Sequence, residues 1–143
     1  MKKQLALFFA LLIFSFSFIA CGDGNPSMDS IKQSYKNEGY TIETSTNDEL
    51  NKIAGVIEGF TAHKGSTVQA NSLWLIAYIY KFDKKNLAEE YINKAESYYI
   101  ISLKGEIYLC LVTGSQIDET GNGQYGNVPT AMQVTLDIFN SCF

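Results

Sequence analysis

The chain has 143 residues, a formal net charge of −4 and no arginine. Without its first 20 residues it would have 123 (143 − 20), enough for one compact domain and too few for two. A mildly acidic chain without guanidinium groups offers no electrostatic footprint for a phosphate backbone, so we expect no nucleic-acid partner.

The N-terminus has the pattern of a bacterial export signal. Lys2 and Lys3 precede an uncharged apolar run from Leu5 to Ala20, which is 16 residues long. A run of this length falls below the roughly 18 to 20 residues that span a bilayer. We therefore predict a signal peptide over residues 1–20, not a permanent membrane helix.

The end of this run, Phe18-Ile19-Ala20-Cys21, resembles the bacterial lipobox, although Phe18 replaces the usual leucine. The resemblance implies a thioether bond from Cys21 to diacylglycerol and cleavage between Ala20 and Cys21. Two acyl chains make membrane anchoring stable where one would be marginal. We expect a lipoprotein outside the cytoplasm, held on the bacterial cell membrane by the lipid on Cys21.

After the lipidated cysteine, residues 21–27 form a flexible polar tether, and residues 28–143 form a single domain. The tether, Gly22 to Ser27, is short, so we expect the domain to lie close to the bilayer.

The first half of the domain mixes helical and strand patterns. Apolar residues predict a helix from Met28 that ends at Gly39, followed by a strand from Tyr40 to Thr44. We expect a short helix from Asn47 to about Ala54 and a strand from Val56 to His63. Helical spacing also fits this last segment, but Gly55 and Gly59 disfavour it.

The second half has clearer signals. Leu73 to Phe82 predicts a central strand, and Asp83 is the expected cap of the following helix. A β-hairpin is predicted from Tyr98 to Thr113, turning at Lys104-Gly105. A loop, Gly114 to Val128, then leads to a helix that begins at Pro129.

The predicted fold class is α+β, with an antiparallel sheet of about five strands and the element order α-β-(α)-β-β-α-β-β-α. We expect the helices to pack on one face of the sheet.

The central strand carries an aromatic row on one of its faces. Its members alternate with a more ordinary apolar set and are Trp74, Ile76, Tyr78, Tyr80 and Phe82. Tyrosine and tryptophan side chains suit a half-hydrated surface because each has an apolar body and a polar tip. The row either fills a core, or exposes Trp74, Tyr78 and Tyr80 as a patch for a peptide, lipid tail, sugar or second copy of the chain.

The domain resembles a group of small lipoproteins from low-GC Gram-positive bacteria that have no established activity. The resemblance spans residues 1–112 and rests on the lipobox and on short structural segments. These segments are Gly39-Tyr40-Thr41-Ile42, Ala62-His63-Lys64-Gly65, Tyr78-Ile79-Tyr80-Lys81-Phe82 followed by Asp83, the helix with Ala88 and Tyr91, and Lys104-Gly105 to Tyr108. It implies the same fold and location.

The remaining reactive residues predict no catalytic group, cofactor or metal site. His63 is the only histidine, so neither a Cys–His pair nor a zinc site can be assembled. Cys110 and Cys142 either form a disulfide or remain as two buried free thiols. Asp118, Thr120 and Asn122 imitate the start of a calcium loop, but Pro129 stands where the closing glutamate belongs.

Two functions fit these observations. The first is a non-catalytic binding or structural module of the cell envelope, with an envelope protein, peptide or glycan as partner. The alternative is an enzyme, or an enzyme accessory, that acts on cell-wall polysaccharide. It requires two carboxylates about 5 to 9 Å apart in a cleft, drawn from Glu58, Asp83, Glu89, Glu106 and Asp118.

Overall fold

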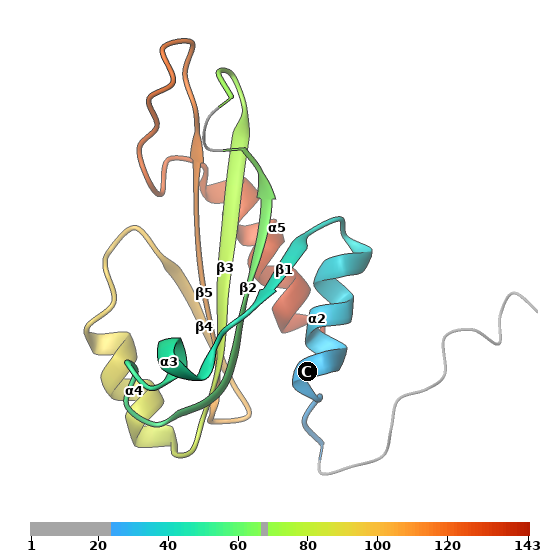
Figure 1. Cartoon of the computed structure of the whole chain (residues 1–143), viewed down its shortest axis with the longest axis vertical. Coiled ribbons are helices and arrows are strands. Elements are labelled where there is room, and N and C mark those ends of the chain that lie inside the picture. Colours follow the sequence, from blue (N-terminus) through green and yellow to red (C-terminus); the bar gives the residue numbers. More distant parts are fainter. Residues whose placement is uncertain (1–23, 67–68) are drawn as a thin grey trace, which may run out of the picture.

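The computed structural model describes residues 24–66 and 69–143 (Figure 1), so the predicted signal peptide and Cys21 lie outside the described residues. The elements in chain order are α2 (Met28–Asn37), β1 (Thr41–Thr44), α3 (Asn47–Leu50), β2 (Val56–Gly65), β3 (Leu73–Phe82), α4 (Lys85–Asn93), β4 (Ile100–Lys104), β5 (Tyr108–Gln116) and α5 (Pro129–Asn140). Within the described ranges, no helix combines the length and apolar character needed to cross a membrane.

The five strands form one antiparallel sheet in the order β1-β2-β3-β5-β4. This arrangement confirms the α+β class, the strand number and the order of the elements. The central strand β3 has the predicted bounds, and strands pair with it on both sides. β5 continues to Gln116, so the long loop begins at Ile117, three residues later than predicted.

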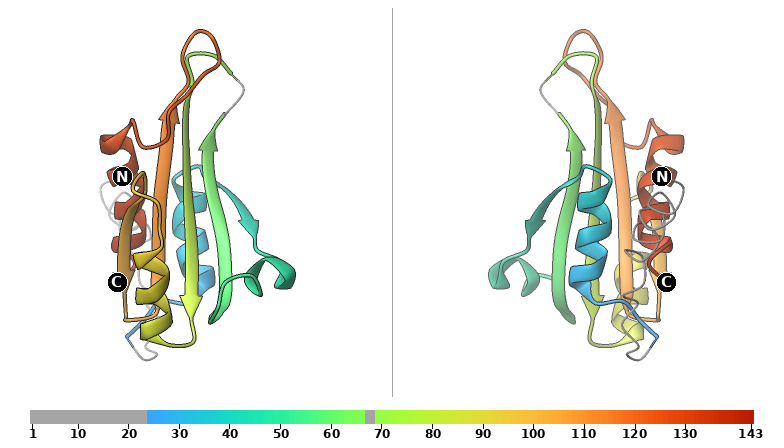
Figure 2. Two further views of the ribbon diagram at one scale, coloured as in Figure 1. Left: turned by 90° about the vertical axis from the view of Figure 1, so that its left-hand side faces the viewer. Right: turned by 90° about the vertical axis from the view of Figure 1, so that its right-hand side faces the viewer.

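The first face of the sheet is covered by α2 and α5 (Figure 2). Helix α2 presents Ile31 and Tyr35, both fully buried, and α5 presents Met132 and Phe139. From β3, alternate residues point into this core because side chains in a strand alternate between the two faces. These residues are Leu75, Ala77 and Ile79.

Gly39 ends α2 as predicted. Its φ of +82° is the left-handed conformation that glycine adopts without steric cost. The N–H of Gly39 donates to the carbonyl of Lys36, and the N–H of Tyr40 donates to the carbonyl of Tyr35. This pair of bonds is a Schellman motif. The rings of Tyr35 and Tyr40 meet edge to face with centroids 5.3 Å apart, which supplies the apolar contact that accompanies the motif.

The opposite face is covered at one end by α4 (Figure 2). Ala88 of α4 is fully buried in a second core with Phe82, Leu109 and Leu111. The prediction that the helices share one face therefore holds for α2 and α5 but is wrong for α4. Phe82, the last residue of β3, points to this face, and without α4 it would be exposed to water.

Asp83 does not cap α4. The N-cap residue is Lys84, which makes no side-chain capping bond. Asp83 instead donates its N–H to the carbonyl of Gly55 at 2.7 Å. The sequence alone could not show this bond, because Gly55 belongs to a distant turn.

The segment that carried conflicting signals is a strand, β2, preceded by the single-turn helix α3. α3 ends at Leu50, not near Ala54, and begins with a capping box between Thr46 and Glu49 that the prediction missed. Gly59 lies opposite Tyr80 in the sheet. A methyl group on Gly59 would come within 2.9 Å of Leu50 Cδ2 and of Tyr80 Cδ1. Glycine is therefore needed here because the Tyr80 ring and a leucine lie against this strand.

Candidate functional site

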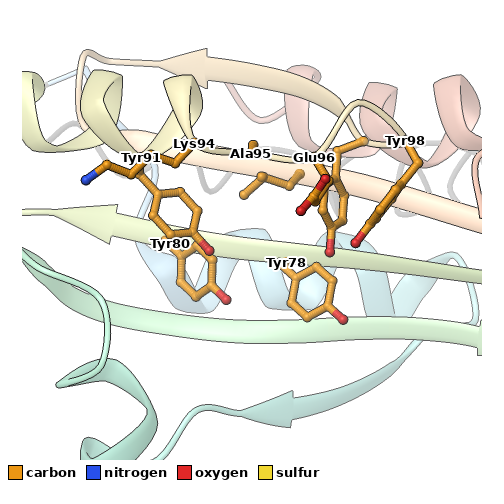
Figure 3. A pocket seen from close by; sticks show the side chains of 9 residues that line it. Tyr78, Tyr80, Tyr91, Lys94, Ala95, Glu96 and Tyr98 are labelled. Carbon is orange, nitrogen blue, oxygen red and sulfur yellow. The ribbon is translucent and has the colours of Figure 1, made fainter.

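A pocket of about 350 Å³ opens on the α4 side of the sheet (Figure 3). Five of the nine tyrosines of the chain line it. We call this site the tyrosine pocket, and its lining residues are Tyr78, Tyr80, Tyr91, Lys94, Ala95, Glu96, Tyr98, Tyr99 and Leu111.

Three separate segments supply the tyrosines. Tyr78 and Tyr80 share one face of β3 because they are two residues apart in a strand. Tyr91 comes from the last turn of α4. Tyr98 and Tyr99 lie in the turn before β4, since that strand begins at Ile100 and not at Tyr98 as predicted.

Two pairs of rings in the pocket pack edge to face. The centroids of Tyr80 and Tyr91 are 5.9 Å apart with an interplanar angle of 77°. The corresponding values for Tyr78 and Tyr99 are 6.1 Å and 82°. This arrangement is favourable for aromatic quadrupoles and fixes the rings. Figure 3 shows Tyr80 beside Tyr91 and Tyr78 opposite Tyr98.

The aromatic surface extends beyond the pocket. Tyr98 stacks on Tyr125 with centroids 5.5 Å apart, and Tyr125 meets Trp74 at 5.6 Å. We call this row of rings the aromatic track, and its members are Tyr80, Tyr78, Tyr99, Tyr98, Tyr125 and Trp74. Trp74 and Tyr80 are six positions apart on β3, which corresponds to about 20 Å in an extended strand.

Four of the five tyrosines of the pocket have a raised pKa. Burial is the main cause that raises the pKa of Tyr78, Tyr80, Tyr91 and Tyr99, and neighbouring tyrosines add to the effect for Tyr78, Tyr80 and Tyr99. These groups therefore remain protonated at and above neutral pH.

The two charged residues of the lining are solvent-exposed. Lys94 Nζ lies 2.6 Å from Glu90 Oε1, and this ion pair lowers the pKa of Glu90. Glu96 is also exposed. Hydroxyl groups and ring surfaces therefore dominate the interior of the pocket.

The three residues of the predicted patch are all half-buried, not fully exposed. Tyr78 and Tyr80 lie together in the pocket, and Trp74 lies at the far end of the track. Sequence reasoning missed the other tyrosines. The adjacent pair Tyr98-Tyr99 was a signal, but only the fold brings it to β3.

Cys110 and Cys142 are both free thiols in the structure, the first buried and the second half-buried. Cys110 is fully buried on β5, where its Sγ lies 3.6 Å from the Tyr35 hydroxyl. Burial raises the pKa of Cys110 to about 12. Cys142 donates from Sγ to the carbonyl of Ile138 at 3.3 Å.

The five carboxylates of the enzyme hypothesis are all exposed: Glu58, Asp83, Glu89, Glu106 and Asp118. The structure brings Glu89 and Glu106 together around Lys85, whose Nζ lies 4.0 and 3.2 Å from their oxygens. Glu58 lines a second pocket of about 460 Å³ at the start of α2, where Asp29 pairs with Lys32. None of the five lines the tyrosine pocket.

Asp118 and His63 have local partners. Asp118 Oδ1 accepts bonds from the N–H and hydroxyl of Thr120 and from the N–H of Asn122, which lowers the pKa of Asp118. His63 Nε2 lies 3.4 Å from Glu43 Oε1 on the neighbouring strand. In residues 24–66 and 69–143, no three His, Cys, Asp or Glu side chains are grouped as they would be to hold a metal ion.

Comparison with protein-family models, curated proteins and solved structures finds no match for this chain. The resemblance to small Gram-positive lipoproteins thus stays a prediction from the sequence.

Proposed function

We propose that the mature protein is a lipid-anchored, non-catalytic binding module of the bacterial envelope that engages its partner at the tyrosine pocket. The observation that carries the proposal is the convergence of five tyrosines from β3, α4 and the turn before β4. Tyrosine gives a large, rigid contact area with a polar tip, and few rotatable bonds must be fixed when it binds.

The chemistry of the lining favours recognition over catalysis. The raised pKa of the half-buried Tyr78, Tyr80 and Tyr99 favours their protonated hydroxyls. A protonated phenol is a good hydrogen-bonding group and a poor proton acceptor near neutral pH. The pocket is thus suited to holding a ligand, and not to abstracting a proton from it.

The start of the described chain supports a definite orientation on the membrane. A methyl group at Gly105, in the β4–β5 turn, would overlap the side chain of Asn25. Asn25 lies four positions after Cys21, a reach of at most about 14 Å. A lipid on Cys21 would therefore hold the β4–β5 turn near the bilayer, and the start of β3, at the opposite end of the sheet in Figure 1, would be directed outward.

The anchor is tested by metabolic labelling with an alkyne fatty acid in a bacterium that produces the full chain. We expect label on the wild type and on Cys142→Ser, which removes a different cysteine, and no label on Cys21→Ser. Equal labelling of the Cys21→Ser variant would overturn the lipid anchor.

The pocket is tested by co-sedimentation of the detergent-solubilised protein with envelope material from the same bacterium. Tyr98→Ala is compared with Phe143→Ala, because these aromatic side chains are 37% and 40% exposed and Phe143 packs on Tyr108 and Phe139, away from the pocket. We expect Tyr98→Ala to lose retention and Phe143→Ala to keep it. Equal retention of both variants would refute a role for the pocket.

A further inference from the structure

The aromatic track and the tyrosine pocket form one continuous surface on the α4 side of the sheet. Ring contacts connect Trp74 through Tyr125 to Tyr98 and Tyr99, and Tyr99 contacts Tyr78 at the pocket. The surface is about 20 Å long because it follows six residue steps along an extended strand, from Trp74 to Tyr80. A compact ligand would occupy only one end of it, so its shape suits a chain.

We infer that the partner is an uncharged glycan chain that lies along β3 from Tyr80 to Trp74. The inference rests on the proposed function, since it names the class of ligand for the same site. Three properties of the surface lead to it: its length, the kind of polar group it offers, and the pairing of Lys94, the one lysine among the described lining residues of the pocket.

The polar groups favour a sugar over a lipid tail. The pocket holds five phenolic hydroxyls, and each of them both donates and accepts a hydrogen bond. The hydroxyls of Tyr80 and Tyr91 bond to each other, as do those of Tyr98 and Tyr99, so each pair keeps spare hydrogen-bonding capacity. An acyl chain would cover that capacity without using it, which costs free energy when water is excluded. A sugar ring has apolar C–H faces that stack on aromatic rings, and its own hydroxyls donate and accept in the same way.

The same argument separates a glycan from a proline-rich peptide, which also binds aromatic grooves. Proline has no N–H, so each proline of such a peptide presents a carbonyl acceptor and no donor, whereas every hydroxyl of a sugar can both donate and accept. The central strands cannot pair with the peptide backbone either, because β3 is already bonded to β2 and β5.

The charge of the lining favours a neutral polymer. Lys94 is paired with Glu90 at 2.6 Å, and Glu96 is the other charged group of the lining. An anionic polymer would meet no unpaired cation in the pocket, and Glu96 would repel it. A neutral glycan has neither penalty.

The defined probes are neutral oligomers of N-acetylglucosamine, glucose, mannose and galactose, each of one to six units, titrated into the full-length protein in detergent. We expect at least one series to bind with an affinity that rises with chain length. Tyr98→Ala and Trp74→Ala should each weaken binding about tenfold or more, the usual cost of truncating an aromatic anchor. Phe143→Ala should leave it unchanged. Absence of binding in all four series would overturn the glycan assignment.

A second arm separates this inference from the proposed function. Envelope material is treated either with protease or with periodate, which cleaves sugars that carry vicinal diols, before the co-sedimentation assay. Internal 4-linked N-acetylglucosamine units carry no vicinal diol, so that series is judged by the titration alone. Loss of Tyr98-dependent retention after periodate alone supports the glycan. Loss after protease alone overturns the glycan while the binding module stands. Retention that never depends on Tyr98 overturns both.

Discussion

Tyr35 should make the protein sensitive to alkali. Its side chain is fully buried between α2 and the sheet, and its hydroxyl donates to the carbonyl of Thr135 at 3.0 Å. Burial raises the pKa of this phenol far above its usual value of 10.0. Above about pH 10 the unfolded chain releases this proton and the folded chain keeps it. The free energy of unfolding therefore falls by about 1.4 kcal/mol per pH unit from this group alone.

The substitution Tyr35→Phe isolates this effect. At pH 7 the variant loses one buried hydrogen bond, which costs about 1 kcal/mol. At about pH 11.5 the wild type has lost about 2 kcal/mol of its free energy of unfolding through Tyr35. The variant has no such phenol, so it should be more stable than the wild type at this pH. Plotted against pH, the free energies of unfolding of the wild type and of Tyr35→Phe should cross at about pH 11.

Urea unfolding followed by circular dichroism, repeated across this pH range, measures the crossing. Met132→Leu is the control, because it is a volume-conserving change in the same core and its effect should be the same at every pH. A Tyr35→Phe variant that stays less stable than the wild type at every pH contradicts the reasoning.

Two further predictions concern the cores. With its pKa raised from about 9 to about 12, Cys110 should carry roughly a thousandfold less thiolate than an ordinary thiol at neutral pH. In the native protein a thiol reagent should therefore modify Cys142 and reach Cys110 only in urea, and equal rates, measured by mass spectrometry, would contradict this. Gly59→Ala should lower the free energy of unfolding by about 1 to 3 kcal/mol, because the new methyl group overlaps the Tyr80 ring and a leucine. It should also weaken envelope retention, and unchanged ring resonances of Tyr80 would argue against this contact.

Local signals in the sequence predicted much of the fold. The apolar run of β3 fixed its bounds, Gly39 marked the end of α2, and Pro129 marked the start of α5. Each of these signals acts within a few residues of the chain, through strand propensity, a left-handed cap or a missing N–H. The Lys94–Glu90 pair on one helix face was predictable for the same reason.

Features that depend on distant contacts could not be predicted. Gly59 was ambiguous because the reason for it, the Tyr80 ring, lies on another strand. α4 could be placed on its face only once Phe82 and Leu109 were known to share that face. Two members of the site, Tyr78 and Tyr80, were visible as a row, but the helix and turn that complete the pocket became apparent only in the fold.

The central claim is that this protein binds its partner at the tyrosine pocket, and photo-crosslinking in intact cells tests it most directly. A photoreactive benzoyl-phenylalanine replaces Tyr98 in one strain and Phe143 in another, at two positions of nearly equal exposure. We expect a covalent adduct of envelope material from position 98 and none from position 143. Equal adducts from both positions, or an adduct from position 143 alone, would contradict the account.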